Sequence, residues 1–251
     1  MKLLAALLLV LLSLGAGAFA QVPINLGTAD QFALLGAASI TNVSPQTRIT
    51  GDVGSSPTPT VTGLVPSQVK GTLYLAASPV TAQAQLDLTT GYNEAAAAAC
   101  GTDLTGTDLG GLTLAPGVYC FDTTAGLTGA LKLDAHGDVN AQWIFQIGSA
   151  LTVAADSTVS IVLNEKKAKE DGIEPLWAKG LEGCNVYWQV GSSATIGADS
   201  LFRGQLLAFV SVTLNGGKFH GKVLASTGAI SITAKQNVNG PPCDAPEVAS
   251  R

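Results

Sequence analysis

Residues able to carry acid–base or metal chemistry are few in this chain, and they stand in turn-like contexts. Asp134, His136 and Asp138 are close enough in sequence to hold a cation together, although polar turn residues explain them more simply. Asp156 and Asp199 share the local sequence Ala-Asp-Ser, and two such carboxylates could cleave a polysaccharide. A corner shared by two repeats accounts for the same recurrence. Common hydrolase, nucleotide-binding and zinc-protease motifs are missing, so the residues alone give only a weak signal for an enzyme or a metal site, and a catalytic triad assembled in space stays open.

A second distinctive set consists of Thr and Ser hydroxyls in short apolar stretches. Apolar residues alternate there with small polar ones, which is typical of strands with one buried face. The positions expected to face outward are Thr41, Thr128, Thr152, Thr195, Thr213 and Ser231. Hydroxyl residues two positions away on the same outward side are Ser39, Ser193, Ser211 and Thr233. Together these residues predict a flat surface of small, uncharged side chains.

Such a surface favours a regular and planar binding partner. Stacked strands would space the hydroxyls about 4.8 Å apart between strands and about 6.7 Å apart along each strand. Thr is stiff at χ1, so these groups would be ordered before binding. Ice is such a partner, whereas a small molecule would need an enclosing pocket. An adhesive, glycan-binding or glycan-cleaving β-helix remains the alternative, because Thr is also common on exposed strands.

These strands belong to a repeat with a period of about 19 residues. Stretches beginning at Gln142, Asn185, Gln205 and Lys222 each contain an apolar strand, a short strand with Thr or Ser, and a third stretch, and a weaker copy begins at Val118. A fixed period of this length is typical of a solenoid, in which stacking supplies the core. A β-sandwich would not produce similarity between whole repeats. We therefore expect a mainly β solenoid of about six coils.

One long α-helix, at about residues 78–100, is expected to interrupt the repeat. Ser78 followed by Pro79 is typical of a helix N-terminus, and Gly101 is expected to end the helix. Its length of roughly 31 Å is close to the height of six stacked strands, so we expect it to lie alongside the whole solenoid. The residues predicted to face the solenoid are Val80, Ala84, Leu88 and Ala95.

The charge content is low and unevenly distributed. Charged residues make up 12% of the chain, and 13 Lys and Arg stand against 18 Asp and Glu, which excludes a nucleic-acid-binding protein. The stretch 164–182 carries nine of these 31 charged residues. We expect it to leave the stack as an insertion, either as a solvated loop or as a cap over a sheet edge.

The N-terminus is typical of a secretory signal. Lys2 precedes an apolar run at residues 3–14, and Ala18-Phe19-Ala20 provides a cleavage site. We therefore expect residues 1–20 to be removed and residues 21–251 to form one secreted, extracellular domain. We expect a monomer without membrane attachment after cleavage.

Export also permits disulfide bonds among the four Cys residues. The connectivity with the shortest loops joins Cys100 to Cys120 and Cys184 to Cys243. Two other connectivities remain open on sequence alone.

Several ordered motifs resemble those of a known family, the secreted microbial ice-binding (antifreeze) proteins. The matching stretches include 26–29 (LGTA), 32–35 (FALL), 50–54 (TGDVG), 109–114 (LGGLTL), 116–119 (PGVY), 145–148 (FQIG) and 188–195 (WQVGSSAT). The resemblance covers nearly all of residues 26–238.

The resemblance implies a right-handed, discontinuous β-solenoid of triangular section with a flanking helix. Its coils would not stack in chain order, because the N-terminal segment would return to pair with the C-terminal coils. It also implies ice as the partner, bound through the flat face that carries Thr41, Thr128 and Ser231. Members of the family are generally not enzymes and need no cofactor.

Overall fold

The computed structural model describes residues 22–138, 140–162 and 183–240. The predicted signal peptide 1–20 and the charged insertion 164–182 lie outside the described residues, as does Cys243 of the predicted second disulfide. The first predicted disulfide, Cys100–Cys120, is confirmed and links the segment after the helix to strand β9 (Gly117–Phe121).

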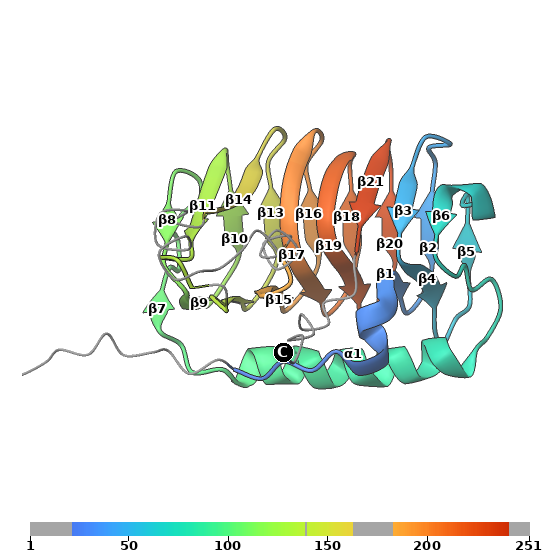
Figure 1. The fold of residues 1–251 in the computed structure, drawn as a ribbon, viewed down its shortest axis with the longest axis horizontal. Helices are drawn as coiled ribbons and strands as arrows, with labels where there is room; N and C mark the ends of the chain where they lie inside the picture. The colour runs from blue at the N-terminus through green and yellow to red at the C-terminus, as the bar shows by residue number, and fades with distance from the viewer. Residues whose placement is uncertain (1–21, 139, 163–182, 241–251) are drawn as a thin grey trace, which may run out of the picture.

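The described chain forms a β-solenoid with three faces, as predicted (Figure 1). One face is a separate parallel sheet of seven short strands. In spatial order these strands are β10 (Ala125–Leu127), β13 (Leu151–Val153), β16 (Ala194–Ile196), β18 (Val212–Leu214), β20 (Ile230–Ile232), β2 (Ile40–Asn42) and β5 (Val61–Thr62).

The other two faces belong to one 14-stranded sheet, because two nine-residue strands bend from one face to the next. These strands are β17 (Ser200–Ala208) and β19 (Gly217–Ala225), with Gly204 and Gly221 at positive φ where they bend. The second face contains β7 (Thr102–Asp103), β9 (Gly117–Phe121), β12 (Trp143–Ile147), β15 (Val186–Val190), the ends of β17 and β19, β1 (Phe32–Gly36) and β4 (Asp52–Ser55). The third face contains β8 (Thr113–Leu114), β11 (Ala130–Asp134), β14 (Thr158–Val162), the starts of β17 and β19, β21 (Gln236–Asn239), β3 (Arg48–Thr50) and β6 (Val69–Lys70).

The coils do not stack in chain order. Strand β1 pairs with β19, β2 with β20, and β3 with β21, so the N-terminal segment continues the stack beyond the C-terminal coil. Blue and red strands are therefore neighbours in Figure 1, while the green coil that follows the helix forms the opposite end. This arrangement confirms the discontinuous solenoid that the resemblance implied.

The interior is filled by side chains that repeat from coil to coil. Tyr119, Phe145, Trp188, Phe202 and Phe219 form an aromatic stack with neighbouring ring centroids 5.5, 4.0, 4.9 and 5.2 Å apart. The apolar residues that alternate with the outward positions of the short strands face inward, and nine of them have at most 2% of their surface exposed: Ile40, Leu127, Leu151, Val153, Ile196, Val212, Leu214, Ile230 and Ile232. The seven-stranded sheet is thus held from below by a packed core, which keeps it rigid.

Helix α1 (Pro79–Ala97) lies along the length of the solenoid, over the second face (Figure 1). The Ser78 hydroxyl accepts a hydrogen bond from the backbone N–H of Val80, which confirms the predicted N-terminus. The helix ends at Ala97, so the prediction that Gly101 directly follows it was wrong. No helix in the described part of the chain is long and apolar enough to span a membrane.

The predicted inward stripe of α1 is correct for three of four residues. Ala84, Leu88 and Ala95 are fully buried, but Val80 is 36% exposed. Thr81 is buried in its place, because the face that meets the sheet follows the spacing of Thr81, Ala84 and Leu88. Val80 stands four residues before Ala84, but at about 100° per residue it falls at the margin of the face centred on Ala84, Leu88 and Ala95, which leaves it partly exposed.

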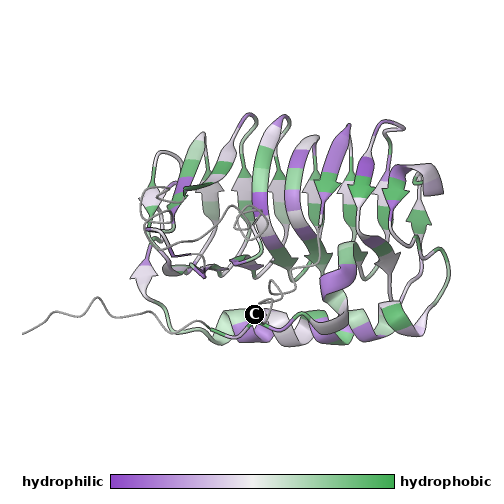
Figure 2. Cartoon of the chain, in the orientation of Figure 1, coloured by the Kyte–Doolittle hydropathy of each residue, from purple (hydrophilic) through white to green (hydrophobic). Residues whose placement is uncertain are grey.

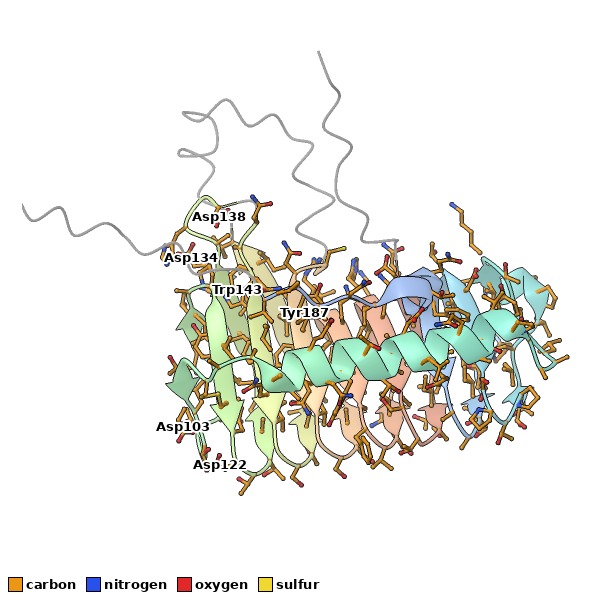
Figure 3. All side chains as sticks on the ribbon, turned by 90° about the horizontal axis from the view of Figure 1, so that it is seen from below. Asp103, Asp122, Asp134, Asp138, Trp143 and Tyr187 are labelled. Atoms are coloured by element: carbon orange, nitrogen blue, oxygen red, sulfur yellow. A yellow bond between two sulfur atoms is a disulfide. The ribbon has the colours of Figure 1, made fainter. Side chains whose placement is uncertain are left out.

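The N-terminal segment is fixed between the helix and the second face. The short 3₁₀-helix η1 (Gly27–Gln31) packs against α1, and a second one, η2 (Pro66–Gln68), precedes β6. The ammonium of Lys222, which is fully buried, lies 3.0 Å from the Asp30 carboxylate of η1. Tyr187 packs beside α1 as well, as Figure 3 shows. Burial, with the nearby carboxylates of Asp30 and Glu94, raises the pKa of Tyr187 to about 12.

Candidate functional site

The outward side chains of the seven-stranded sheet form one line across the solenoid. Strand pairing places a single residue of each strand in the same register, and five of the six predicted central positions fall on this line. We call the hydroxyl residues on it the threonine row: Thr152, Thr195, Thr213, Ser231, Thr41 and Thr62. Neighbouring strands are about 4.8 Å apart, so the row presents closely spaced hydroxyl and methyl groups.

Thr128 does not belong to this row, contrary to the prediction. Gly126 occupies the equivalent position, because Ala125 and Leu127 pair with Leu151 and Val153. Thr128 is exposed but lies two residues further along the chain. The Leu-Thr pair at 127–128 resembles that at 151–152, and only the strand pairing reveals the shift of two residues.

Asp108 fixes Thr128 at the end of the sheet and was missed by the sequence analysis. One Asp108 carboxylate oxygen accepts from the backbone N–H of Thr128 and the other from its hydroxyl, both at 3.0 Å. Burial raises the pKa of Asp108, but the hydrogen bonds from Gly110 and Thr128 outweigh this effect and leave the pKa below its usual value. An isolated bridge also joins Asp108 to Gly126, so a carboxylate stands one position beyond the glycine that ends the row.

Thr62 was missed for a different reason. Strand β5 has two residues, which is too short for a visible alternation of apolar and polar side chains. It pairs with β2 so that Thr62 lies opposite Thr41, at the other end of the sheet from Gly126. The only signal available in the sequence was the Val-Thr pair itself.

The four flanking hydroxyl residues lie beyond the ends of the short strands, three at the N-terminal ends and one at a C-terminal end. Ser39, Ser193 and Ser211 lie just before their strands, whereas Thr233 follows its strand. The Ser193 hydroxyl accepts from the backbone N–H of Ser211, and the Ser211 hydroxyl accepts from that of Ala229. These two serines therefore help to hold successive coils together. At the C-terminal ends of the strands, the Thr233 hydroxyl donates to the Asn215 side-chain oxygen at 2.8 Å.

The seven short strands carry no charged residue. The row side chains are half-buried or exposed, while their strand neighbours form the core, so each points outward from a fixed backbone. Thr41 donates to the Ser231 hydroxyl at 3.4 Å, which joins the N-terminal and C-terminal parts of the row. The surface is thus ordered and weakly polar, and its groups need little rearrangement to meet a flat partner.

The acidic residues considered for chemistry lie in turns. Asp156 and Asp199 have φ values of 60° and 56°, so they share the same left-handed corner conformation in two coils. Asp134 accepts from the backbone N–H of His136, and Asp138 accepts from that of Asn140. Both of these aspartates lie near one end of the molecule (Figure 3). Within the described ranges, no group of three His, Cys, Asp or Glu residues is arranged to hold a metal ion.

Comparison with known proteins agrees with the fold. A sequence model of the family described as Ice-binding-like matches residues 34–238. An ice-binding protein of Nostoc sp. (strain HG1) is 42% identical over 216 residues, covering 85% of this chain and 73% of the relative. One of Leucosporidium sp. (strain AY30) is 31% identical, with 92% and 88% covered.

Solved structures of similar proteins show the same architecture. The crystal structure of an ice-binding protein from an Antarctic biological consortium aligns with a TM-score of 0.73 and 35% identity, covering 87% of this chain and 91% of that one. The structure of an ice-binding protein from Antarctomyces psychrotrophicus aligns with a TM-score of 0.73 and 28% identity, with 87% and 98% covered. The motifs, the discontinuous three-faced solenoid and the family match agree, and the chain belongs to the Ice-binding-like family.

Proposed function

We propose that this protein adsorbs to ice through the threonine row and the surface around it. The observation that supports this most directly is the register of six Thr and Ser residues on seven parallel strands without a charged side chain. The similarity to proteins described as ice-binding proteins supports the same partner. Of the predicted residues, Thr41, Thr152, Thr195, Thr213 and Ser231 form the centre of the proposed surface.

The physical basis of this adsorption is the number of groups that meet ice at once. A single hydroxyl–water hydrogen bond adds little, because liquid water offers the same bond. A rigid face that presents many such groups together loses little entropy on binding, so small contributions add up. The methyl groups of the threonines cover the space between hydroxyls without competing for water.

The flanking residues have unequal roles in this proposal. Ser193 and Ser211 use their oxygens to accept backbone hydrogen bonds, and their hydroxyl protons remain for contact with water. Ser39 lies beside the row at the N-terminal end of β2, and Thr233 lies beside it at the C-terminal end of β20. Thr128, held by Asp108, borders the row at its Gly126 end.

Adsorbed protein would curve the ice front between bound molecules and thereby inhibit growth and recrystallisation. We propose that the protein acts outside the cell as a secreted monomer, without enzyme activity, metal or cofactor. Neither nucleic acid nor membrane is a partner in this proposal.

The direct test is to grow a single ice crystal in a micromolar solution of the protein. We expect faceting or arrest of the crystal within a gap between melting and freezing temperatures. A crystal that grows as a rounded disc, as in buffer alone, would contradict ice binding. Freezing a solution slowly gives a second readout, because an ice-binding protein enters the ice while an inert protein of similar size stays in the liquid.

A further inference from the structure

The basic residues of the described chain are concentrated on the third face of the solenoid. Seven Lys and Arg residues lie in the described ranges, and five of them occupy outward positions of this face. They are Lys132 on β11, Arg203 on β17, Lys218 on β19, Arg48 on β3 and Lys70 on β6. The chain as a whole carries a net charge of −5, so this concentration runs against the average. Figure 2 shows hydrophilic segments along these strands.

Three of these cations form a compact group at the end of the face that the N-terminal segment completes. Lys218 and Arg48 lie in the same register, with Asn237 of β21 between them. Lys70 lies on the next strand, in register with Thr50. With strands about 4.8 Å apart, the two ends of this group are separated by only three strand spacings. We call Lys218, Arg48 and Lys70 the basic cluster.

In the part of the chain that the structure describes, no carboxylate occupies an outward strand position beside the basic cluster, and Asp52 and Asp199 lie at the corners that adjoin it. Among the outward strand positions described for this face, the one carboxylate is Asp134 on β11, at the far end, where it contacts His136. Lys218, Arg48 and Lys70 are exposed, and in the described ranges none of them lies within 4.0 Å of a carboxylate. Arg48 donates to two backbone carbonyls, which fixes its position on the sheet.

We propose that the basic cluster binds an anionic polysaccharide of the kind found outside cells, such as a polyuronate. The basic cluster and the amide side chains between its members form a flat group three strand spacings long, which suits carboxylates and hydroxyls repeated along a linear polymer. Asn237 and Asn239 supply those amides from β21, between the strands of Lys218 and Arg48. The basic cluster lies on a different face from the threonine row, so the protein can bind the polymer and ice at the same time.

The composition of the cluster favours a polysaccharide over a membrane. Interfacial membrane binding uses aromatic or aliphatic side chains that enter the lipid, together with basic ones. Of the exposed large apolar residues, only Val162 lies on a described strand of this face, at the Asp134 end, while Val43 and Val65 lie in the turns before β3 and β6 and not between the cations. Electrostatic attraction without insertion matches a hydrated, charged polymer.

The test uses the full secreted chain and two double variants with equal net charge. K70Q with K218Q removes two cations from the cluster, while T89E with T90E adds two negative charges on the exposed side of α1. Binding to alginate, to neutral dextran, to anionic vesicles and to duplex DNA is measured in about 10 mM salt, where the screening length is about 30 Å. Ice shaping is measured on the same samples.

We expect the unaltered protein to bind alginate but not dextran, and to lose this binding as salt rises. K70Q with K218Q should weaken alginate binding about 30-fold, whereas T89E with T90E should change it little. Absence of alginate binding, equal losses in the two variants, or tighter binding to vesicles or DNA than to alginate would each overturn the proposal. Ice shaping should be unchanged in both variants, so failure of the polysaccharide site and failure of ice binding are distinguishable.

Discussion

Replacing Thr213 with tyrosine tests the proposed surface at its centre. Strand β18 is the fourth of seven strands, so three strands lie on each side of Thr213. Its neighbours in register are Thr195 and Ser231. A phenol ring that stands above the central strand would hold a flat ice surface away from both neighbours. Ice could then meet only one side of the sheet.

The magnitude follows from this geometry. One side of the sheet contains at most three of the seven strands, so thermal hysteresis should fall below three sevenths of the value for the unaltered protein. The remaining hysteresis should be lower still if adsorption requires many groups to meet ice at once. Thr213 points outward from a strand whose neighbours in sequence form the core, so the free energy of unfolding should change by less than about 0.5 kcal/mol.

The assay is thermal hysteresis over a series of protein concentrations, with a thermal melt of each sample. The matched control is Thr158→Tyr, which places the same ring at a half-buried outward position of β14, on the third face. We expect the control to keep full activity. Full hysteresis in Thr213→Tyr, or an equal loss in both variants, would refute the assignment of ice binding to the threonine row.

Four further predictions concern the row and its support. Gly126→Thr should extend the row and raise hysteresis, because the added Cβ meets only the Asp108 side chain, whose carboxylate oxygen at 3.0 Å must shift by a few tenths of an ångström and whose Cγ lies at 3.9 Å. Unchanged activity would exclude this end from ice contact. Leu88→Ala, at a fully buried position of α1, should lower the free energy of unfolding by about 2–5 kcal/mol in chemical denaturation. Asp30→Ala should cost about 3–5 kcal/mol in the same measurement, because the fully buried Lys222 loses its carboxylate; a loss below about 1 kcal/mol would show that the pair adds little. The pKa of Tyr187 is raised from 10 to about 12, so the unfolded chain ionises first as the pH rises. The free energy of unfolding should therefore fall by roughly 2–3 kcal/mol between these two pH values, as measured in denaturant titrations at stepped pH. Tyr187→Phe should remove this pH dependence.

Local patterns were sufficient to predict the elements that depend on local chemistry. The Ser78 cap and the alternation in strands such as β16 and β18 arise from neighbouring residues, and the structure reproduces both. The inward stripe of α1 was right for Ala84 and Leu88 but wrong for Val80, since the direction from which a sheet approaches a helix is not encoded in the helix alone.

The errors in the candidate site arise where pairing between distant strands decides the register. Thr128 follows Leu127 just as Thr152 follows Leu151, yet the pairing of Leu127 with Val153 moves Thr128 out of the row. A three-residue strand offers two such alignments, and shifting a strand by two residues keeps its apolar side inward. Asp108 meets Gly126 through an isolated bridge, which no periodicity in the sequence could have revealed.

The continuity of the threonine row depends on the return of the N-terminal segment to the C-terminal coil. Thr41 and Ser231 are 190 positions apart in the chain but occupy neighbouring strands, and their hydroxyls are 3.4 Å apart. Without β2 and β5 the sheet would lose two of its seven strands, and the row would lose Thr41 and Thr62. The pairing of β1 with β19 and the buried contact between Lys222 and Asp30 hold this segment in place, far from the surface that it completes. If adsorption scales with the number of ordered groups, then residues that fix the N-terminal segment control ice binding without touching ice, because they determine whether the row ends at Ser231 or continues beyond it.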